Sequence, residues 1–240
     1  MRLKTRLLLS FVVLALVPIA VVVPKARLEL RKTLEQELEQ RMSSAVTATR
    51  ADIVQRTHDV RATMDSLTDT NEMERVARDL HARITPSRLS SVAERLIRTR
   101  SLSVLSILDE KGVTLSSGHL PARMGDPDPD LFALTRITDP EPQVVLVEVR
   151  GDAGLKKMPA LATARPVEYG ELRLWVVGGM LLDESVAKHL AKLTGTQVEI
   201  ASRDVSYAAA GSEPPPLKPG KVKLSSPDVW INLSLSRATV

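Results

Sequence analysis

A basic, then apolar, then basic segment at the N-terminus constrains this chain more than any other feature. Arg2, Lys4 and Arg6 precede an uncharged run of 17 residues from Leu7 to Val23, and basic residues follow it. As a helix this run would rise about 26 Å, which is close to the ~30 Å hydrocarbon core of a bilayer. The segment therefore predicts a helix that crosses a membrane.

A cleaved signal peptide is the main alternative for the same segment, because such peptides also begin with basic residues. Their cleavage site is a small-x-small triplet, which residues 20–24 do not offer, and their apolar run is usually about 7–15 residues long. A retained anchor over residues 1–24 is therefore favoured, and a buried core helix is the third interpretation. The positive-inside rule weakly favours a cytoplasmic N-terminus, because basic residues flank both ends.

Composition excludes several classes of function. The formal net charge is +4, and three of the positive charges lie in the first six residues. The remainder has no basic block and few aromatic side chains for stacking on bases, so no nucleic-acid partner is expected. The chain contains no cysteine, so a disulfide framework, a thiolate metal site and a cysteine nucleophile are excluded. No cofactor is predicted.

Residues 25–69 form the longest predicted helix. Apolar side chains recur every three or four residues, charged residues fill the other face, and no Gly or Pro interrupts the run after Pro24. Unbroken, this helix would span roughly 66 Å, which suggests a stalk that rises from the membrane and pairs with a second copy as a homodimer. Strict heptads are not sustained, so no full coiled coil is predicted. The apolar positions are Leu30, Leu34, Leu38, Met42, Ala45 or Val46, Ile53, Val60, Met64 and Leu67.

Two shorter helices and then a strand-rich region follow the stalk. Thr70-Asn71 marks a break before a helix at 72–84, and Ser87 is a candidate N-cap for a helix at 88–99. Gly178-Gly179 is predicted to end the strand that begins at Leu172. Strands are predicted at 102–108, 113–117, 144–149, 161–167, 172–177, 197–201, 222–224 and 229–235, with a short helix near 130–135, a helix at 183–193 and a proline-rich loop at 212–220.

Three segments resemble the Cache/PAS-like extracytoplasmic sensor domains. The sequence ILDEKGVTLSS at 107–117, with Met124-Gly125 after it, resembles the family's strand, acidic-glycine turn and second strand. ATARPV at 162–167 resembles the strand with the a-x-P-[VI] turn, and WVVGGMLLD at 175–183 resembles the strand that runs into a helix beside the ligand pocket. With the anchor and the long first helix, the arrangement is similar to the sensory part of a bacterial membrane histidine kinase.

The order of elements predicts an α+β fold, and the resemblance makes its sheet PAS/Cache-like, antiparallel and flanked by helices. The predicted parts are a transmembrane anchor at 1–24, a helical stalk with membrane-proximal helices at 25–100 and a sensor domain at 101–237. Residues 238–240 would begin a second membrane helix. Such a domain would lie outside the bacterial cytoplasmic membrane, which this chain would cross once.

The function implied by the resemblance is signal sensing by the outer part of a two-component receptor. The kinase part of such a receptor would lie outside this chain, so the chain itself is expected to have no enzymatic activity. Two alternatives share the same features. One is a standalone membrane-anchored binding or scaffold protein of the envelope, and the other is the sensor half of a chemotaxis receptor.

The candidate ligand-binding residues lie near turns that would rim a PAS-like pocket. Arginine forms bidentate bonds with carboxylates, so Arg123 or Arg165 could hold an anionic ligand, although a structural ion pair is the commoner role for an arginine. Asp183 could bind an amine or cap the helix that follows it, and the cap is favoured. Tyr169 and Trp175 could line the pocket, although core packing is the default. The candidates are His119, Arg123, Arg165, Tyr169 and Asp183.

Three other patterns are weaker. His58 begins a His-acidic-apolar-basic run similar to a phosphoacceptor box, but the following proline is missing, so an exposed helical histidine is favoured. Asp126, Asp128 and Asp130 alternate as calcium ligands can, but the glycine and carboxylate positions of an EF-hand loop hold leucine and isoleucine. The four histidines lack metal-ligand spacing and no nucleophile elbow is present, so neither a metal site nor a catalytic set is predicted.

Overall fold

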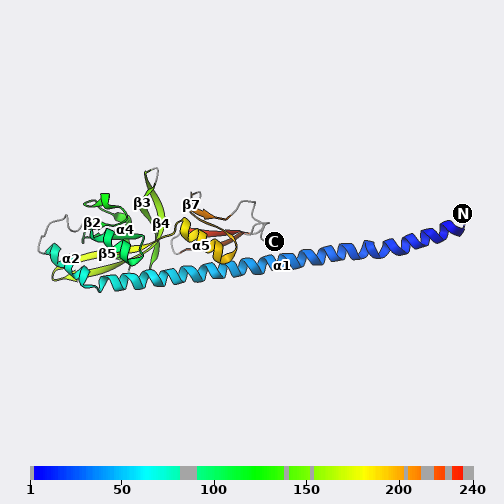
Figure 1. The fold of residues 1–240 in the computed structure, drawn as a ribbon, viewed down its shortest axis with the longest axis horizontal. Coiled ribbons are helices and arrows are strands. Elements are labelled where there is room, and N and C mark those ends of the chain that lie inside the picture. The colour runs from blue at the N-terminus through cyan, green and yellow to red at the C-terminus, as the bar shows by residue number, and fades with distance from the viewer. Residues whose placement is uncertain are drawn as a thin grey trace.

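The computed structural model describes residues 3–81, 91–137, 141–151, 154–202, 205–211, 219–224 and 229–234. Side chains are described from Lys25 onward, apart from residues 72, 80 and 81. One helix, α1 (Leu3–Thr68), dominates the molecule. Its 66 residues rise about 99 Å. Figure 1 shows α1 running along both sheets, with its N-terminal part projecting beyond them.

The predicted stalk helix is confirmed, and its backbone continues without a break into the segment predicted as the anchor. The side chains of residues 1–24 lie outside the described part of the chain, as do residues 238–240. Within the part of the chain that the structure describes, no helix is long and apolar enough to cross a membrane.

Five strands form the first sheet, in the order β2-β1-β5-β4-β3. Every neighbouring pair is antiparallel, and the longest pairing runs from Ala160 opposite Leu181 to Tyr169 opposite Leu172. The central position of β5 between β1 and β4 is not a consequence of chain order and was not predicted. The strands are β1 (Val104–Leu108), β2 (Thr114–Ser117), β3 (Gln143–Gly151), β4 (Gly154–Tyr169) and β5 (Leu172–Leu181).

Four strands form a second antiparallel sheet, in the order β7-β6-β9-β8. It lies nearer to the N-terminal end of α1 than the first sheet does (Figure 1). Helix α5 (Glu184–Thr194) leads from β5 into this sheet and packs against β6 and β7. The strands are β6 (Gln197–Ser202), β7 (Val205–Ala210), β8 (Pro219–Lys223) and β9 (Trp230–Ser234).

Helix α1 packs on each of the two sheets in the same way, with a methionine of the helix lying over a glycine of the sheet. Met64 is fully buried and fills the space that a side chain at Gly178 of β5 would need. Met42 does the same over Gly220 of β8. The predicted apolar stripe is thus buried or partly buried from Leu38 onward, whereas the sheets leave its first members exposed.

The close approach of α1 explains one wrong prediction. Gly178 and Gly179 do not end β5, which continues to Leu181. A Cβ at Gly178 would overlap Met64, and a Cβ at Gly179 would overlap the backbone of β4 at Ala162. The strand therefore has glycine at these two positions because α1 and β4 come too close to leave room for a side chain.

Shorter helices cover the first sheet on its two faces. Helices α2 (Asn71–His81) and α3 (Val92–Arg100) pack on the same side as α1, and α3 begins four residues later than predicted. The opposite side, which we call the outer face, is covered by the segment that follows β2. That segment contains the 3₁₀ turn η2 (Pro121–Arg123), helix α4 (Pro129–Ala133) and the 3₁₀ turn η3 (Leu134–Arg136).

Candidate functional site

His119 and Arg123 lie close together on the outer face. His119 follows β2, and its Nδ1 lies 3.3 Å from the Ser117 hydroxyl and 3.4 Å from the Leu105 carbonyl oxygen. Burial lowers the pKa of His119, although the Leu105 carbonyl and the Asp128 carboxylate act in the opposite direction. The imidazole is therefore held mainly in its neutral form near neutral pH.

The guanidinium of Arg123 joins three elements through two carboxylates. It lies 3.0 Å from Asp128 Oδ2 and 3.1 Å from Glu148 Oε2 on β3. Asp128 is buried and caps α4, because its Oδ1 accepts a hydrogen bond from the Leu131 amide at 3.1 Å. Arg123 thus forms structural ion pairs, which the sequence analysis gave as the alternative to ligand binding.

Arg165 and Tyr169 lie on the other face of the sheet, toward the helices. The Arg165 Nε is 2.6 Å from Asp65 Oδ1 on α1, and another guanidinium nitrogen donates to the Thr163 hydroxyl at 2.8 Å. The guanidinium of Arg78 on α2 lies 5.8 Å from the centre of the Tyr169 ring. A hydrogen bond with Tyr169 is also the largest cause that raises the pKa of Arg78. These two residues therefore fasten β4 to α1 and α2.

Asp183 caps α5, as the sequence favoured. Its Oδ1 accepts hydrogen bonds from the amides of Ser185 at 2.9 Å and Val186 at 3.3 Å. The five candidate residues are consequently found in three separate places: His119 and Arg123 on the outer face, Arg165 and Tyr169 on the opposite face, and Asp183 at the start of α5. Asp128 and Glu148 complete the first of these pairs, and sequence reasoning missed them. The Asp128-Pro129 sequence was an available signal for the helix cap.

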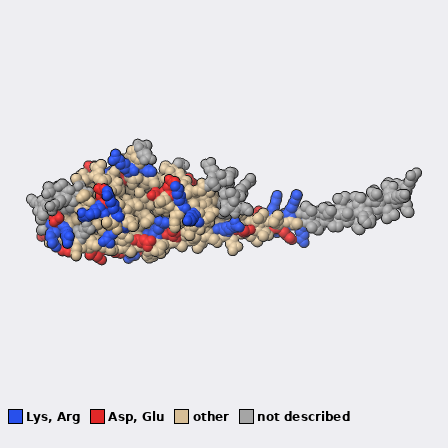
Figure 2. All heavy atoms as spheres, viewed as in Figure 1, with Lys and Arg blue, Asp and Glu red and all other residues tan. Residues whose placement is uncertain are grey.

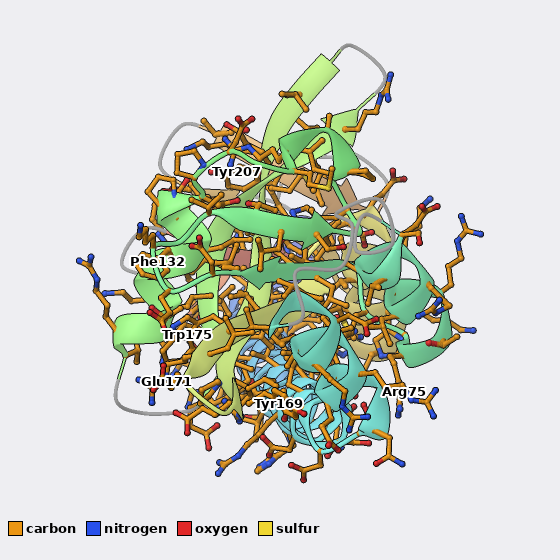
Figure 3. All side chains as sticks on the ribbon, turned by 90° about the vertical axis from the view of Figure 1, so that its left-hand side faces the viewer. Arg75, Phe132, Tyr169, Glu171, Trp175 and Tyr207 are labelled. Atoms are coloured by element: carbon orange, nitrogen blue, oxygen red, sulfur yellow. The ribbon has the colours of Figure 1, made fainter. Side chains whose placement is uncertain are left out.

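Aromatic side chains pack between the outer face and its covering segment. The ring of Phe132 fills the space beside Gly112, and the guanidinium of Arg173 lies 5.5 Å from the centre of the Trp175 ring. Figure 3 shows Phe132 and Trp175 on the same side of the molecule, with Tyr207 of the second sheet above them. All three rings pack on one cluster of buried residues, so core packing holds for Trp175.

Two of the three acids in the alternating pattern at 126–130 have basic partners within the protein. Asp128 is bound to Arg123, and Asp130 is 3.1 Å from the Lys157 ammonium. Within the described ranges, no group of three or more acidic, histidine or cysteine side chains is placed to hold a metal ion. His58 is exposed on α1.

No family model and no curated protein sequence matches this chain. Solved structures do match its fold. The periplasmic domain of Vibrio cholerae LuxQ aligns with a TM-score of 0.59 at 15% identity, over 81% of this chain and 99% of that domain. A second crystal structure of the same LuxQ domain gives 0.58 at 13% identity, over 82% and 99%. The domain of a sensory box/GGDEF family protein from Vibrio parahaemolyticus gives 0.50 at 10% identity, over 84% and 98%.

The chain therefore has the fold of bacterial periplasmic sensor domains. The prediction that the chain adopts the fold of such sensor domains is confirmed. The α+β class with a long N-terminal helix and antiparallel sheets is confirmed with it.

Proposed function

We propose that this chain is the signal-sensing, extracytoplasmic part of a bacterial membrane receptor of the two-component histidine kinase class. One observation carries the proposal. A single helix, α1, contacts both sheets of a sensor fold and continues toward the N-terminal segment whose sequence fits a membrane anchor. A change in either sheet would therefore reach the membrane through one continuous rod.

Signal transfer in this proposal is a shift between two packings of the sheets on α1. A ligand can shift that balance only if it binds one packing more tightly than the other. The methionine-over-glycine contacts at Met64 and Met42 make the packing sensitive to small displacements, because closely packed interfaces do not deform continuously.

Two further features belong to the proposal. Residues 1–24 anchor the chain in the cytoplasmic membrane, and α1 pairs with a second copy. The homodimer is supported by two leucines of α1 that lie beyond the sheets. Leu30 is 61% exposed and Leu34 is 39% exposed, and because they are four residues apart they lie on one side of a largely charged part of the helix.

The ligand contacts we propose for the outer face are His119 and Arg123. An anionic ligand would compete with Glu148 for the guanidinium of Arg123, since Glu148 is the less buried of its two carboxylate partners. The structural contacts of Arg165, Tyr169 and Asp183 support packing and capping roles for these three instead.

A receptor fusion tests the function. Residues 1–234 would be joined to the second membrane helix and kinase of another two-component receptor that drives a transcriptional reporter. Gly178→Val should change the reporter output several-fold, because the added side chain displaces Met64 and hence α1. Adding Met64→Ala should return the output toward that of the unmodified fusion.

The control is Glu171→Val, in an exposed turn of the same sheet. Immunoblots would show that every fusion reaches the membrane at a similar level. A reporter output that Gly178→Val leaves unchanged at matched protein level would contradict signalling through α1.

A further inference from the structure

A cavity lies where α1 meets both sheets. It encloses about 320 Å³, which is at the small end of the ~300–1,000 Å³ typical of ligand pockets. One wall is α1 at Ile53, Val54 and Thr57, another is the start of β3 with Leu161 of β4, and the third is β8 with Leu224. We call this cavity the inter-sheet crevice.

The interior of the inter-sheet crevice is apolar. Val144 and Leu161 from the first sheet and Val222 and Leu224 from the second are buried members of the core. Val54 lines the same crevice but is 51% exposed, which is unusual for a valine beside the core. An apolar molecule in the crevice would cover Val54 and extend the core between the two sheets.

The rim of the inter-sheet crevice carries two cations without partners. Arg50 and Lys223 are exposed, and neither has an ion-pair or hydrogen-bond partner among the described residues. The carboxylate of Glu141 also lines the crevice, but Arg61 binds it. Charge complementarity at the rim therefore favours a negatively charged group, and guanidinium and ammonium groups bind carboxylates through charge-assisted hydrogen bonds.

We infer that the inter-sheet crevice binds a small amphipathic carboxylate, with its apolar chain between the sheets and its carboxylate at Arg50 and Lys223. This rests on the proposed sensor function and gives it a second site, separate from His119 and Arg123. The bound molecule would touch α1 and both sheets at once. It would therefore stabilise the packing in which these three elements are closest.

Octanoate binding to the full chain tests the inference, by calorimetry and by thermal unfolding. Octanoate should bind saturably and raise Tm, whereas octylamine, with the same apolar chain and the opposite charge, should not. The double variant Arg50→Gln, Lys223→Gln should weaken octanoate binding by about 10-fold or more, because each lost bond involves two charged groups. Lys192→Gln, an exposed cation on α5 outside the crevice, is the matched control and should bind normally.

Val54→Asp is an independent variant, because it places a carboxylate on an exposed part of the wall and should repel octanoate without disturbing the core. Absent saturable binding, or binding unchanged in both the double variant and Val54→Asp, would overturn the inference. Either result would leave the receptor fusion's response to Gly178→Val intact. Crevice-dependent binding with a silent fusion would instead retain the site and remove the sensor function.

Discussion

Single side chains show why the predicted ligand residues have other partners. Arg123 and Arg165 were chosen because arginine binds carboxylates, and both do so, but the carboxylates belong to the protein. Residue type predicts the chemistry of a contact, whereas the identity of the partner depends on the fold. Asp65 and Arg165 are one hundred residues apart in sequence, and no local pattern joins them. The cap at Asp183 was predictable because its partners are two and three residues away.

Thr49 gives a prediction about stability. Its side chain is fully buried in α1, and its hydroxyl has no hydrogen-bond partner among the described residues. An unsatisfied buried hydroxyl costs about 1–3 kcal/mol. Thr49→Val should therefore raise the free energy of unfolding by about 1 kcal/mol in urea denaturation. The native Thr57 hydroxyl donates a hydrogen bond to the Ile53 carbonyl at 2.9 Å. Thr57→Val should therefore bring no such gain in the free energy of unfolding. A loss of stability in Thr49→Val would contradict the account.

His119 gives a prediction about pH. Burial lowers its pKa in the folded protein below the ordinary 6.5, so the unfolded chain binds more protons as pH falls through that value. Stability should therefore fall between about pH 7.5 and about pH 5.5. His119→Gln should lose less stability over this interval than the unmodified protein, measured by urea denaturation at each pH. His58→Gln, at an exposed histidine, is the control. Identical pH slopes for His119→Gln and the unmodified protein would exclude the buried neutral imidazole.

Elements were predicted well where the sequence period was strong. The α1 stripe, the β1–β2 hairpin and α5 were found because their apolar spacing and turn residues agree with their structure. Strand β7 was missed because Val-Ser-Tyr-Ala-Ala-Ala is short and mostly small, which leaves little alternation to detect. The division of the strands into two sheets was not predicted either, since pairing depends on contacts far apart in sequence.

The contact between α1 and the second sheet can be measured by a double-mutant cycle. Gly220→Val should destabilise the protein by about 1–3 kcal/mol, because the added side chain overlaps Met42 and Val46. Met42→Ala should also destabilise it, by leaving a cavity. Together they should cost less than their sum by at least about 0.5 kcal/mol, since the valine fills the space that the methionine leaves. Additive effects in urea denaturation would show that Met42 does not lie over Gly220.

At the scale of the molecule, α1 extends well past the sheets. Figure 2 shows acidic and basic side chains interspersed on the part of α1 beyond the sheets and over the visible face of the body. The exposed leucines of the same part of the helix lie among these charges. A helix of this kind is stabilised when an apolar stripe is covered by a partner.

Disulfide trapping tests the homodimer, and it is clean because the chain has no cysteine of its own. Leu34→Cys should crosslink rapidly under mild oxidation in membranes. Lys32→Cys is the control, because Lys32 and Leu34 are two residues apart and therefore lie on nearly opposite sides of the helix. Equal crosslinking of both variants, or of neither, would argue against pairing through the leucine face of α1.

The most direct test of the central claim is the side of the membrane on which the sensor fold lies. Glu171→Cys places a single thiol in an exposed turn of the first sheet, at the end of the molecule far from the N-terminus (Figures 1 and 3). Thr5→Cys places one before the apolar segment. In cells with a permeabilised outer membrane and an intact inner membrane, a membrane-impermeant maleimide should label Glu171→Cys at once and Thr5→Cys only after lysis. Labelling of Glu171→Cys that also requires lysis would contradict an extracytoplasmic sensor.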